Sequence, residues 1–503
     1  MKKWMIFLLA LVMCLSFAAC GEEHEEIGSE GLVYVRNDDG TYTVSGIGTC
    51  TDSHVVIPQY HEGKRVSAIA ESAFYDCQTM EEITIPETIE DIGLRIFDQC
   101  SALHTIYYNS PYSPQGAYIV DHCWQDNLFI AESNVQKMVF GGRVVPQNIC
   151  RYADNITEVV FLDSVTIIDD CAFEGCSGLT SIEIPDSVIG VDNQAFRDCT
   201  GLVRVELPDD VIICDGAFSG CSSLEDVEFY ASTTSFDPNV DQNALRDSDG
   251  YFLISPSRCF QISYRAFADC ISLTSIEIPY GITGIGERAF EGCSGLTSVK
   301  ISDTVTHIDY AAFRSCSSLA SIELPDSVIA IDDAAFYDCI SLRSIVIPDS
   351  VTSFGQSRFS VFEGVFTNCS SLACVTIGNG VTQISDYAFS GCINLTTIVM
   401  PDSITEISHY AFKGCSSLTG IHIPDSVTSL GNQAFSGCSS LERIEIADSI
   451  TNIGKFAFWH CSSLAEIHFG GTEGQWIAIF KDYYWDANTD KYIIYCTDGE
   501  IKK

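Results

Sequence analysis

A phrase of 23 residues repeats along most of this chain, and it constrains the fold more strongly than any other feature of the sequence. One copy runs from Leu319 to Cys339. The Phe of its Ala-Phe pair recurs, mostly at steps of 23 residues, at Phe267, Phe290, Phe313, Phe336, Phe366, Phe389, Phe412, Phe435 and Phe458. A fixed period of this length is typical of stacked structural units, each of which contacts only its neighbours. The chain is therefore expected to form an elongated array, which can reach 503 residues without one large core.

The residue types within one copy predict the course of one turn. Leu319, Ile322 and Leu324 have the spacing of a short strand whose aliphatic side chains point to one side. Pro325 ends the strand, because proline cannot donate the hydrogen bond that would continue the ladder. Residues 332–339 are expected to form about two turns of helix or 3₁₀-helix, with the Ala, Phe and Cys side chains facing inward. Stacked copies then place columns of Leu, Ile, Phe and Cys in the interior.

The repeat Leu-x-x-Ile-x-Ile-Pro-Asp-Ser-Val-Thr-x-Ile-x-x-x-Ala-Phe-x-x-Cys-Ser-Ser resembles the BspA-like, Treponema-type leucine-rich repeat. The resemblance extends over residues 31–501, since Gly46-Ile-Gly48 and Gly471-Thr-Glu-Gly-Gln-Trp476 are similar to segments that flank the repeats in that family. It implies a curved α/β solenoid that is displayed on a bacterial surface or secreted, and a role in adhesion to host proteins or other cells. It supplies no catalytic residues.

The fold class predicted is an α/β leucine-rich-repeat solenoid of about 17 turns with a cap at each end. Its predicted parts are an N-terminal cap (32–72), the solenoid (73–468) with irregular units near 107–152, 230–256 and 354–362, and an aromatic C-terminal cap (469–503). The central strand positions are Ile83, Ile106, Met138, Val159, Ile182, Val205, Val227, Leu253, Ile276, Val299, Ile322, Ile345, Val375, Ile398, Ile421, Ile444 and Ile467. Parallel strands stack roughly 4.8 Å apart, so the array is expected to be about 80 Å long.

Residues 1–20 have the pattern of a lipoprotein signal peptide. Two lysines precede an apolar stretch from Ile6 to Phe17, and Phe-Ala-Ala-Cys20 is similar to the bacterial lipobox, in which the Cys is acylated. Ordinary secretion with cleavage after Ala19 is the alternative. Residues 21–31 are acidic, contain glycine and are expected to form a flexible tether. The protein is therefore expected to be exported, and either anchored at the bacterial cell surface by a lipid on Cys20 or secreted.

The balance of charge excludes some classes of partner. The chain carries 68 acidic and 26 basic residues, a formal net charge of −42. A surface this acidic repels nucleic acid and anionic lipid headgroups, so neither is an expected partner, and the lipid anchor is the only expected contact with a membrane. We expect a monomer that binds a protein, such as a host protein or another bacterial surface protein.

Fourteen of the 24 cysteines occupy one position of the repeat, three residues after the Phe. They are Cys77, Cys100, Cys176, Cys199, Cys221, Cys270, Cys293, Cys316, Cys339, Cys369, Cys392, Cys415, Cys438 and Cys461. Many cysteines in an exported protein ordinarily indicate disulfides, but parallel side chains in one column are poorly aimed for the required dihedral angle. The column is therefore expected to hold buried thiols that act as small apolar groups and weak donors to the backbone. Any disulfide is expected among the other cysteines.

The sequence contains no pattern typical of an enzyme. It has no Cys-x-x-Cys pair and no His-Glu-x-x-His, which are typical of zinc sites, and it lacks the glycine patterns of phosphate and dinucleotide sites. The aspartates that follow proline, such as Asp326, are explained better by turn formation than by a column of cation ligands. We therefore predict a non-enzymatic protein without a cofactor or a metal.

The residue after the central aliphatic position points outward, because side chains alternate along a strand. The candidate binding residues at this position are Glu183, Glu206, Glu228, Glu277, Lys300, Glu323, Val346, Thr376, Val399 and His422. The first of them form an acidic ladder, whereas the stretch from Val346 to His422 is neutral and partly apolar. Stacked like charges are destabilising, so an acidic column favours a functional role. A solvated face that prevents aggregation is the alternative.

These residues favour a surface protein that mediates adhesion or another protein–protein interaction through its exposed strand face. Loops of the irregular units, especially residues 111–127, are expected to add contacts. The alternative is a carbohydrate- or cell-wall-associated binding module, for which the aromatic residues after Cys461 offer a platform. A hydrolase function has no support, because the sequence offers no convincing pair of carboxylates that breaks the repeat.

Overall fold

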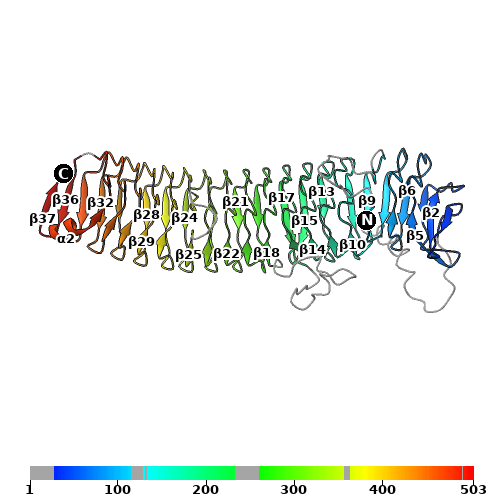
Figure 1. Ribbon diagram of the computed structural model, residues 1–503, viewed down its shortest axis with the longest axis horizontal. Helices are drawn as coiled ribbons and strands as arrows, with labels where there is room; N and C mark the ends of the chain where they lie inside the picture. Colours follow the sequence, from blue (N-terminus) through cyan, green and yellow to red (C-terminus); the bar gives the residue numbers. More distant parts are fainter. Residues whose placement is uncertain (1–27, 115–128, 131–132, 233–259, 356–362, 490) are drawn as a thin grey trace.

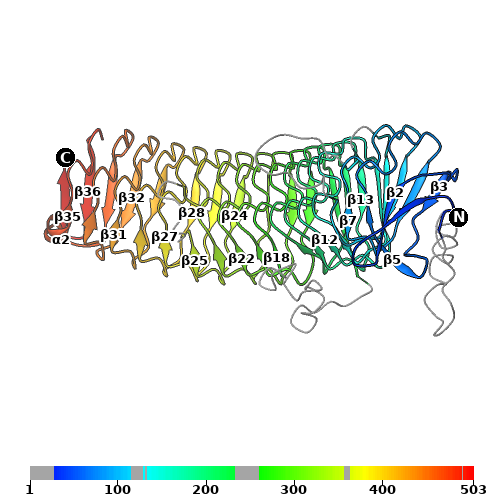
Figure 2. The ribbon, with the colours of Figure 1, turned by 45° about the vertical axis from the view of Figure 1, so that its right-hand side comes forward.

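The chain folds into a long rod of stacked turns (Figure 1). The computed structural model describes residues 28–114, 129–130, 133–232, 260–355, 363–489 and 491–503. About 18 turns are stacked along the rod, which confirms the predicted leucine-rich-repeat solenoid. The turns follow the order of the sequence from one end of the rod to the other (Figure 2). The predicted signal peptide, Cys20 and most of the predicted tether lie outside the described residues.

One side of the rod is a ladder of parallel strands, one on almost every turn; the turn of Ile322 has no regular strand. Neighbouring strands pair in register, so that equivalent residues such as Ile276 and Val299 lie side by side. In strands such as β19 and β21 the central aliphatic residue is buried and the residues on either side of it are exposed. The strands of this first ladder are β3 (His54–Val56), β6 (Glu82–Ile85), β8 (Thr105–Tyr108), β9 (Lys137–Phe140), β11 (Glu158–Phe161), β13 (Ser181–Glu183), β15 (Arg204–Pro208), β17 (Asp226–Tyr230), β19 (Ser275–Glu277), β21 (Ser298–Lys300), β24 (Ser344–Val346), β26 (Cys374–Thr376), β28 (Thr397–Val399), β30 (Gly420–His422), β32 (Arg443–Ile446), β34 (Glu466–Phe469) and β36 (Ile493–Cys496).

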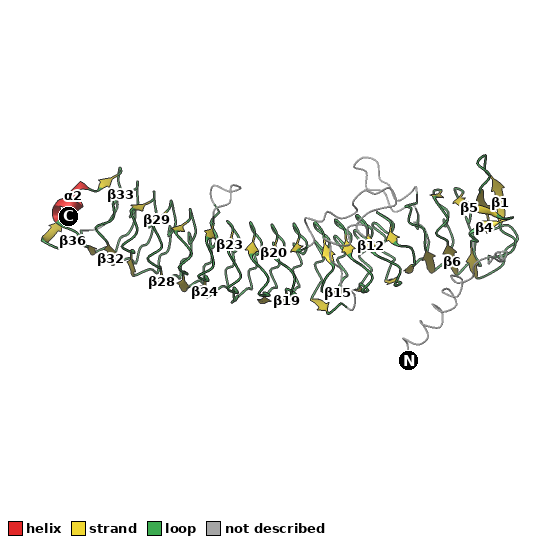
Figure 3. Ribbon diagram, turned by 90° about the horizontal axis from the view of Figure 1, so that it is seen from below, coloured by secondary structure: helices red, strands yellow, loops and turns green. Residues whose placement is uncertain are grey.

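A second ladder, of two-residue strands, runs along another side of the rod. Its strands are β7 (Asp91–Ile92), β10 (Val144–Val145), β12 (Ile167–Ile168), β14 (Gly190–Val191), β16 (Ile212–Ile213), β18 (Gln261–Ile262), β20 (Gly284–Ile285), β22 (His307–Ile308), β23 (Ala330–Ile331), β25 (Ser353–Phe354), β27 (Gln383–Ile384), β29 (Glu406–Ile407), β31 (Ser429–Leu430), β33 (Asn452–Ile453) and β35 (Phe480–Lys481). Figure 3 shows the two ladders along opposite edges of a gently curved rod, with the first ladder on the outer side of the bend. The second residue of each pair from β7 to β33 is buried, so both ladders contribute to one core.

The segment between the second ladder and the repeat cysteine is not helical, and the prediction of helix or 3₁₀-helix there was wrong. In residues 332–339 the backbone makes successive tight turns, with Ala334 and Asp338 in the left-handed region (φ 55° and 58°). Alternate N–H groups donate within the turn and to the next turn: Cys339 N to Phe336 O (3.2 Å), and Phe336 N to Val365 O (2.9 Å). A helix would direct every N–H group along its own axis, whereas the stack gains hydrogen bonds between its turns.

The interior of the rod is built from continuous columns, as predicted. Phe313 is fully buried, and its ring stacks on those of Phe290 (5.4 Å between centroids) and Phe336 (5.5 Å). The Sγ atom of Cys339 donates to the carbonyl oxygen of Phe313, one turn away (3.2 Å). Thirteen of the fourteen column cysteines bind the preceding turn in this way. The cysteines that the structure describes are free thiols, in agreement with the predicted thiol column.

The stack of turns continues past the irregular units. Strands β8 and β9 pair directly, with Ile106 beside Met138, so the array continues through the first irregular unit as predicted. At the second unit the ring of Phe267 stacks directly on that of Phe218 (5.4 Å), so the turns of these two residues are neighbours in the stack. The turn predicted at Leu253 was therefore wrong; Leu253 itself lies outside the described residues.

Each end of the rod has additional elements. At the N-terminal end, β1 (Val33–Arg36), β2 (Tyr42–Gly46), β4 (Tyr60–His61) and β5 (Lys64–Ile69) join one sheet with β7. At the C-terminal end, α2 (Glu473–Ala478) precedes β35, and β37 (Gly499–Lys502) pairs antiparallel with β36. The ring of Trp476 is buried against Phe469 (5.2 Å). That these ends act as caps stays a prediction. None of the helices within the described ranges has the length and apolar character to cross a bilayer.

Candidate interaction surface

The predicted binding residues lie in one row on the first ladder. Residues Glu183, Glu206 and Glu228 occupy equivalent positions on successive strands. The same pairing places Lys300 beside Glu277, and Thr376 between Val346 and Val399. Glu323 is exposed on the turn between β21 and β24, which has no regular strand, and His422 is exposed on β30. We call this row, together with the residues beside it on the same strands, the strand face. The structure places the predicted residues together, while their role in binding stays a prediction.

Arg204 compensates the acidic part of the strand face, and sequence reasoning missed it. Its guanidinium group lies 3.0 Å from the carboxylate of Glu206 and 3.1 Å from that of Asp226, and it also contacts Glu228. The hydrogen bond to Glu206 is the main cause that raises the pKa of Arg204. Arg204 precedes Glu206 by two residues and so shares its side of the strand, a signal that was present in the sequence. The acidic column is therefore less repulsive than stacked glutamates alone would be.

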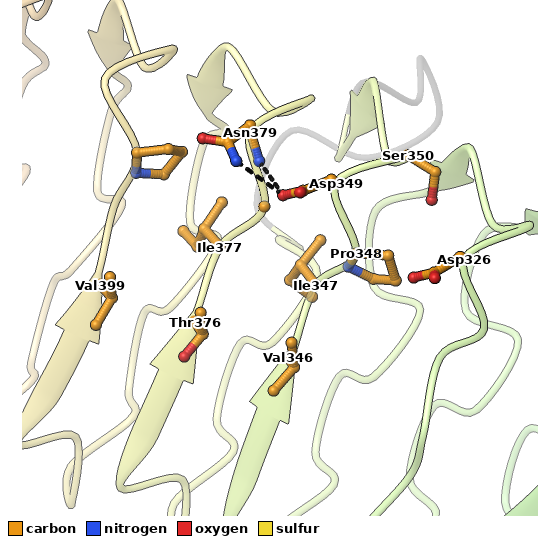
Figure 4. Close-up of a pocket in the computed structure, with 12 residues that line it drawn as sticks. Asp326, Val346, Ile347, Pro348, Asp349, Ser350, Thr376, Ile377, Asn379 and Val399 are labelled. Carbon is orange, nitrogen blue, oxygen red and sulfur yellow. Dashed lines mark hydrogen bonds between the residues drawn. The ribbon is translucent and has the colours of Figure 1, made fainter.

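The middle of the strand face is uncharged and apolar. Val346 and Val399 expose 63% and 54% of their surface, and Thr376 lies between them. Beside these residues lies an open groove of about 610 Å³ (Figure 4). Its lining residues are Asp326, Val346, Ile347, Pro348, Asp349, Ser350, Thr376, Ile377, Gly378, Asn379, Val399 and Pro401.

The groove forms where one copy of the repeat departs from the common phrase. Where neighbouring turns have Pro348 and Pro401, this turn has Gly378, which leaves a hollow between two proline rings. A Cβ atom on Gly378 would lie 2.4 Å from the backbone carbonyl of Pro348, so this turn also packs too closely on its neighbour for a side chain. Sequence reasoning missed Gly378, although the change from Ile-Pro-Asp-Ser to Ile-Gly-Asn-Gly was visible.

Carboxylates form the rim of the groove. Oδ1 of Asp349 accepts hydrogen bonds from the backbone N–H (2.7 Å) and the side-chain Nδ2 (3.1 Å) of Asn379 (Figure 4). These bonds fix the carboxylate at the edge of the hollow, while the residue stays exposed. Asp326 is exposed on the preceding turn. Among the lining residues there are two carboxylates and no lysine or arginine.

Charged residues return on the C-terminal side of the groove. Nδ1 of His422 lies 3.2 Å from Oε2 of Glu445, and Nη2 of Arg443 donates to Oε1 of the same carboxylate (2.5 Å). The strand face therefore has three zones: an acidic zone with Arg204 and Lys300 as its cations, an apolar zone around Val346 and Val399, and a mixed zone that begins at His422. The insertion loops predicted to add contacts lie mostly outside the described residues.

A cluster of three carboxyl groups lies on another side of the rod, next to the second ladder. Oxygen atoms of Asp169, Asp170 and Asp192 lie within 4.8 Å of one another. Burial raises the pKa of Asp169 to about 6 and that of Asp192 to about 7, and the charge of Asp170 adds to the effect on Asp192. Oδ1 of Asp192 accepts the N–H of Asn193 (2.7 Å). Asp169 and Asp192 therefore titrate closer to neutral pH than ordinary carboxyl groups do, a property that sequence reasoning did not anticipate.

Comparison with known proteins agrees with this architecture. The profile of the family described as "BspA type Leucine rich repeat region" matches the chain in 6 copies, over residues 50–140, 143–248, 238–365 and 360–475. Proteins of the leucine-rich repeat family generally take part in protein–protein interaction and are typically non-enzymatic. No curated protein matches the chain.

Several solved structures are similar to the chain over most of its length. A leucine-rich repeat protein from Bacteroides ovatus is 24% identical, with a TM-score of 0.49 and coverage of 95% of this chain and 100% of its own. A leucine rich cell surface protein from Faecalibacterium prausnitzii is also 24% identical (TM-score 0.35; 92% and 99% covered). The pneumococcal vaccine antigen PcpA is 17% identical (TM-score 0.35; 90% and 90% covered). Because the family profile covers most of its length, the chain belongs to the BspA-type leucine-rich repeat family.

Proposed function

We propose that this protein is exported, is held at the bacterial cell surface by a lipid on Cys20, and binds a protein partner through its strand face as an adhesin. The observation that carries the proposal is the contrast between a uniform interior and a varied exterior. The Phe column repeats almost without change, whereas the outward position holds Glu, Lys, Val, Thr and His in turn. The fold accepts all these residue types at one position, so their order is available to specify a partner.

The charge distribution supports a partner with a basic surface. The chain has a net charge of −42, and carboxylates dominate the first zone of the strand face. Long-range attraction would guide a basic partner toward the rod, and the apolar zone would then add contact area. Membership of the family supports protein binding, and a similar protein that is described as a cell surface protein supports a position at the cell surface. We propose that the protein acts as a monomer.

Exposed aromatic residues at the C-terminal end favour one second candidate, a carbohydrate- or cell-wall-binding module. Tyr483 and Tyr484 expose 77% and 67% of their surface, and Phe480 lies nearby in β35. Aromatic rings with a wet edge suit contacts with sugars as well as with proteins. This candidate predicts that glycans, and not proteins, bind the purified chain.

The test is to apply residues 21–503 to arrays of host proteins and of glycans. The triple substitution Glu183→Lys, Glu206→Lys and Glu277→Lys reverses the acidic zone. The matched control, Glu71→Lys, Asp154→Lys and Glu406→Lys, makes the same change in net charge outside the strand face. We expect protein binding that is lost in the first variant and kept in the control. Binding that both variants retain would exclude the acidic zone, and binding to glycans alone would favour the second candidate.

A further inference from the structure

The apolar zone has a chemistry that the fold itself does not require. Glu, Lys, Thr and His occupy the position of Val346 and Val399 on other turns, and the strands of those turns pair in the same register. The two valines nevertheless expose most of their surface to solvent beside the groove. Exposed apolar surface next to a hollow is typical of contact sites, because its burial against a partner is favourable.

We propose that the groove at Gly378 is a subsite for an extended, basic peptide segment of the protein partner. This inference rests on the proposed function and names the chemistry of the partner. An apolar side chain of the segment fills the hollow between Pro348 and Pro401 and contacts Val346 and Val399. A lysine or arginine of the same segment binds the carboxylate of Asp349 or Asp326 at the rim.

Charge complementarity assigns the basic character. The lining contains two carboxylates and no cationic side chain. Both donors of Asn379 bind Oδ1 of Asp349, which holds the carboxylate in place and leaves Oδ2 for a donor from the partner. A charged hydrogen bond of this kind is stronger than a neutral one and fixes the register of the segment. An acidic segment would be repelled by the same carboxylates and by the net charge of the rod.

The spacing of the turns sets the spacing within the partner. The hollow at Gly378 lies one turn from Asp349 and two turns from Asp326, which corresponds to roughly 5 Å and 10 Å along the rod. An extended chain advances about 3.3 Å per residue. The apolar residue and the cation are therefore expected about two to three residues apart in a segment that runs along the rod, across the strands.

The experiment selects random linear peptides displayed on phage against residues 21–503. We expect the selected peptides to share a lysine or arginine about two or three positions from an apolar residue, and to lose about tenfold or more in affinity for two double variants. One is Val346→Ser with Val399→Ser, and the other is Asp326→Asn with Asp349→Asn. Ile393→Ser is the matched control, because Ile393 is about half exposed on a neighbouring turn but does not line the groove.

The outcomes separate this inference from the proposed function. If the selected peptides are acidic, or bind both double variants as tightly as the wild type, the groove is not a subsite for a basic peptide. The same conclusion follows if the wild type selects no peptide. If the array experiment still finds a protein partner that depends on Glu183, Glu206 and Glu277, the strand face remains the binding surface. If neither the peptide selection nor the protein array gives the expected binding, the proposed function is excluded as well. Because the substituted side chains are exposed, unchanged thermal unfolding verifies that each variant is folded.

Discussion

Replacing Phe313 by alanine tests whether the stacked phenyl column stabilises the rod turn by turn. The ring is fully buried and lies between the rings of Phe290 and Phe336, with interplanar angles of 4° and 10°. Alanine leaves a cavity of ring size, for which core substitutions of this kind cost about 3–5 kcal/mol. Leucine keeps much of the volume but removes two aromatic contacts of roughly 0.5–1.5 kcal/mol each, so we expect a loss of about 1–3 kcal/mol.

Hydrogen exchange followed by mass spectrometry measures where this loss appears. Each turn contacts only its neighbours, so we expect faster exchange in the turns of Phe290, Phe313 and Phe336, and unchanged exchange in the turn of Phe435. Urea unfolding gives the total loss. Tyr280→Ala is the control, because Tyr280 is 78% exposed. A loss below about 1 kcal/mol for Phe313→Ala, or faster exchange spread evenly along the chain, would refute the reasoning.

Three further predictions concern thiols, carboxyl groups and the groove. Iodoacetamide should modify the exposed Cys374 in the native protein but Cys339 only after denaturation, because burial raises the pKa of Cys339; rapid native labelling of Cys339, read by mass spectrometry, would contradict this. The pKa of Asp192 is raised to about 7 from 3.8, so its contribution to stability is present below pH 4 and is lost as the pH rises through 7. Asp192→Asn should therefore raise the free energy of unfolding at pH 8 by up to about 4 kcal/mol and change it little at pH 4. The midpoint of thermal unfolding at the two pH values measures this difference, and equal effects at both values would exclude this account. Gly378→Ala should cost about 1–3 kcal/mol in urea unfolding because its Cβ meets the backbone of Pro348, whereas Gly474→Ala, whose Cβ has room, should not; equal stability of both variants would contradict the packing.

The sequence was sufficient to predict the interior of the rod. Leu319, Ile322 and Phe336 recur with one period; the Phe position changes little, and the other two accept only apolar residues of similar size, because a stacked column fixes the volume. The same periodicity predicted that Cys339 is a buried thiol that donates to the backbone, and the structure identifies the acceptor as the carbonyl oxygen of Phe313. Periodicity did not identify the conformation of residues 332–339, because a helix and a series of tight turns can both bury Ala, Phe and Cys at this spacing. The hydrogen bonds between turns decide in favour of tight turns.

The candidate site was predicted only in part. Strand alternation correctly placed the outward residues in one row, since it depends on local geometry alone. The groove forms because Gly378 has no side chain where the neighbouring turns have proline. Sequence reasoning looked for charged, polar and aromatic side chains, and so it did not single out a glycine. Arg204, one of the two cations of the acidic zone, was missed for a different reason. Arg204 reaches across to the next strand, and only the register of β15 and β17 shows which carboxylates it meets.

The hydrogen bonds between turns have a mechanical consequence. They run along the rod, on the two strand ladders and on the side of the tight turns alike, so a pull on the two ends loads the contacts between turns in series. Under such a load the weakest contact opens first, while the remaining turns stay folded. One released turn of 23 residues lengthens from roughly 5 Å to as much as about 75 Å. A stack of this kind unfolds in steps under load, and the work of unfolding limits the force that reaches an attachment at either end.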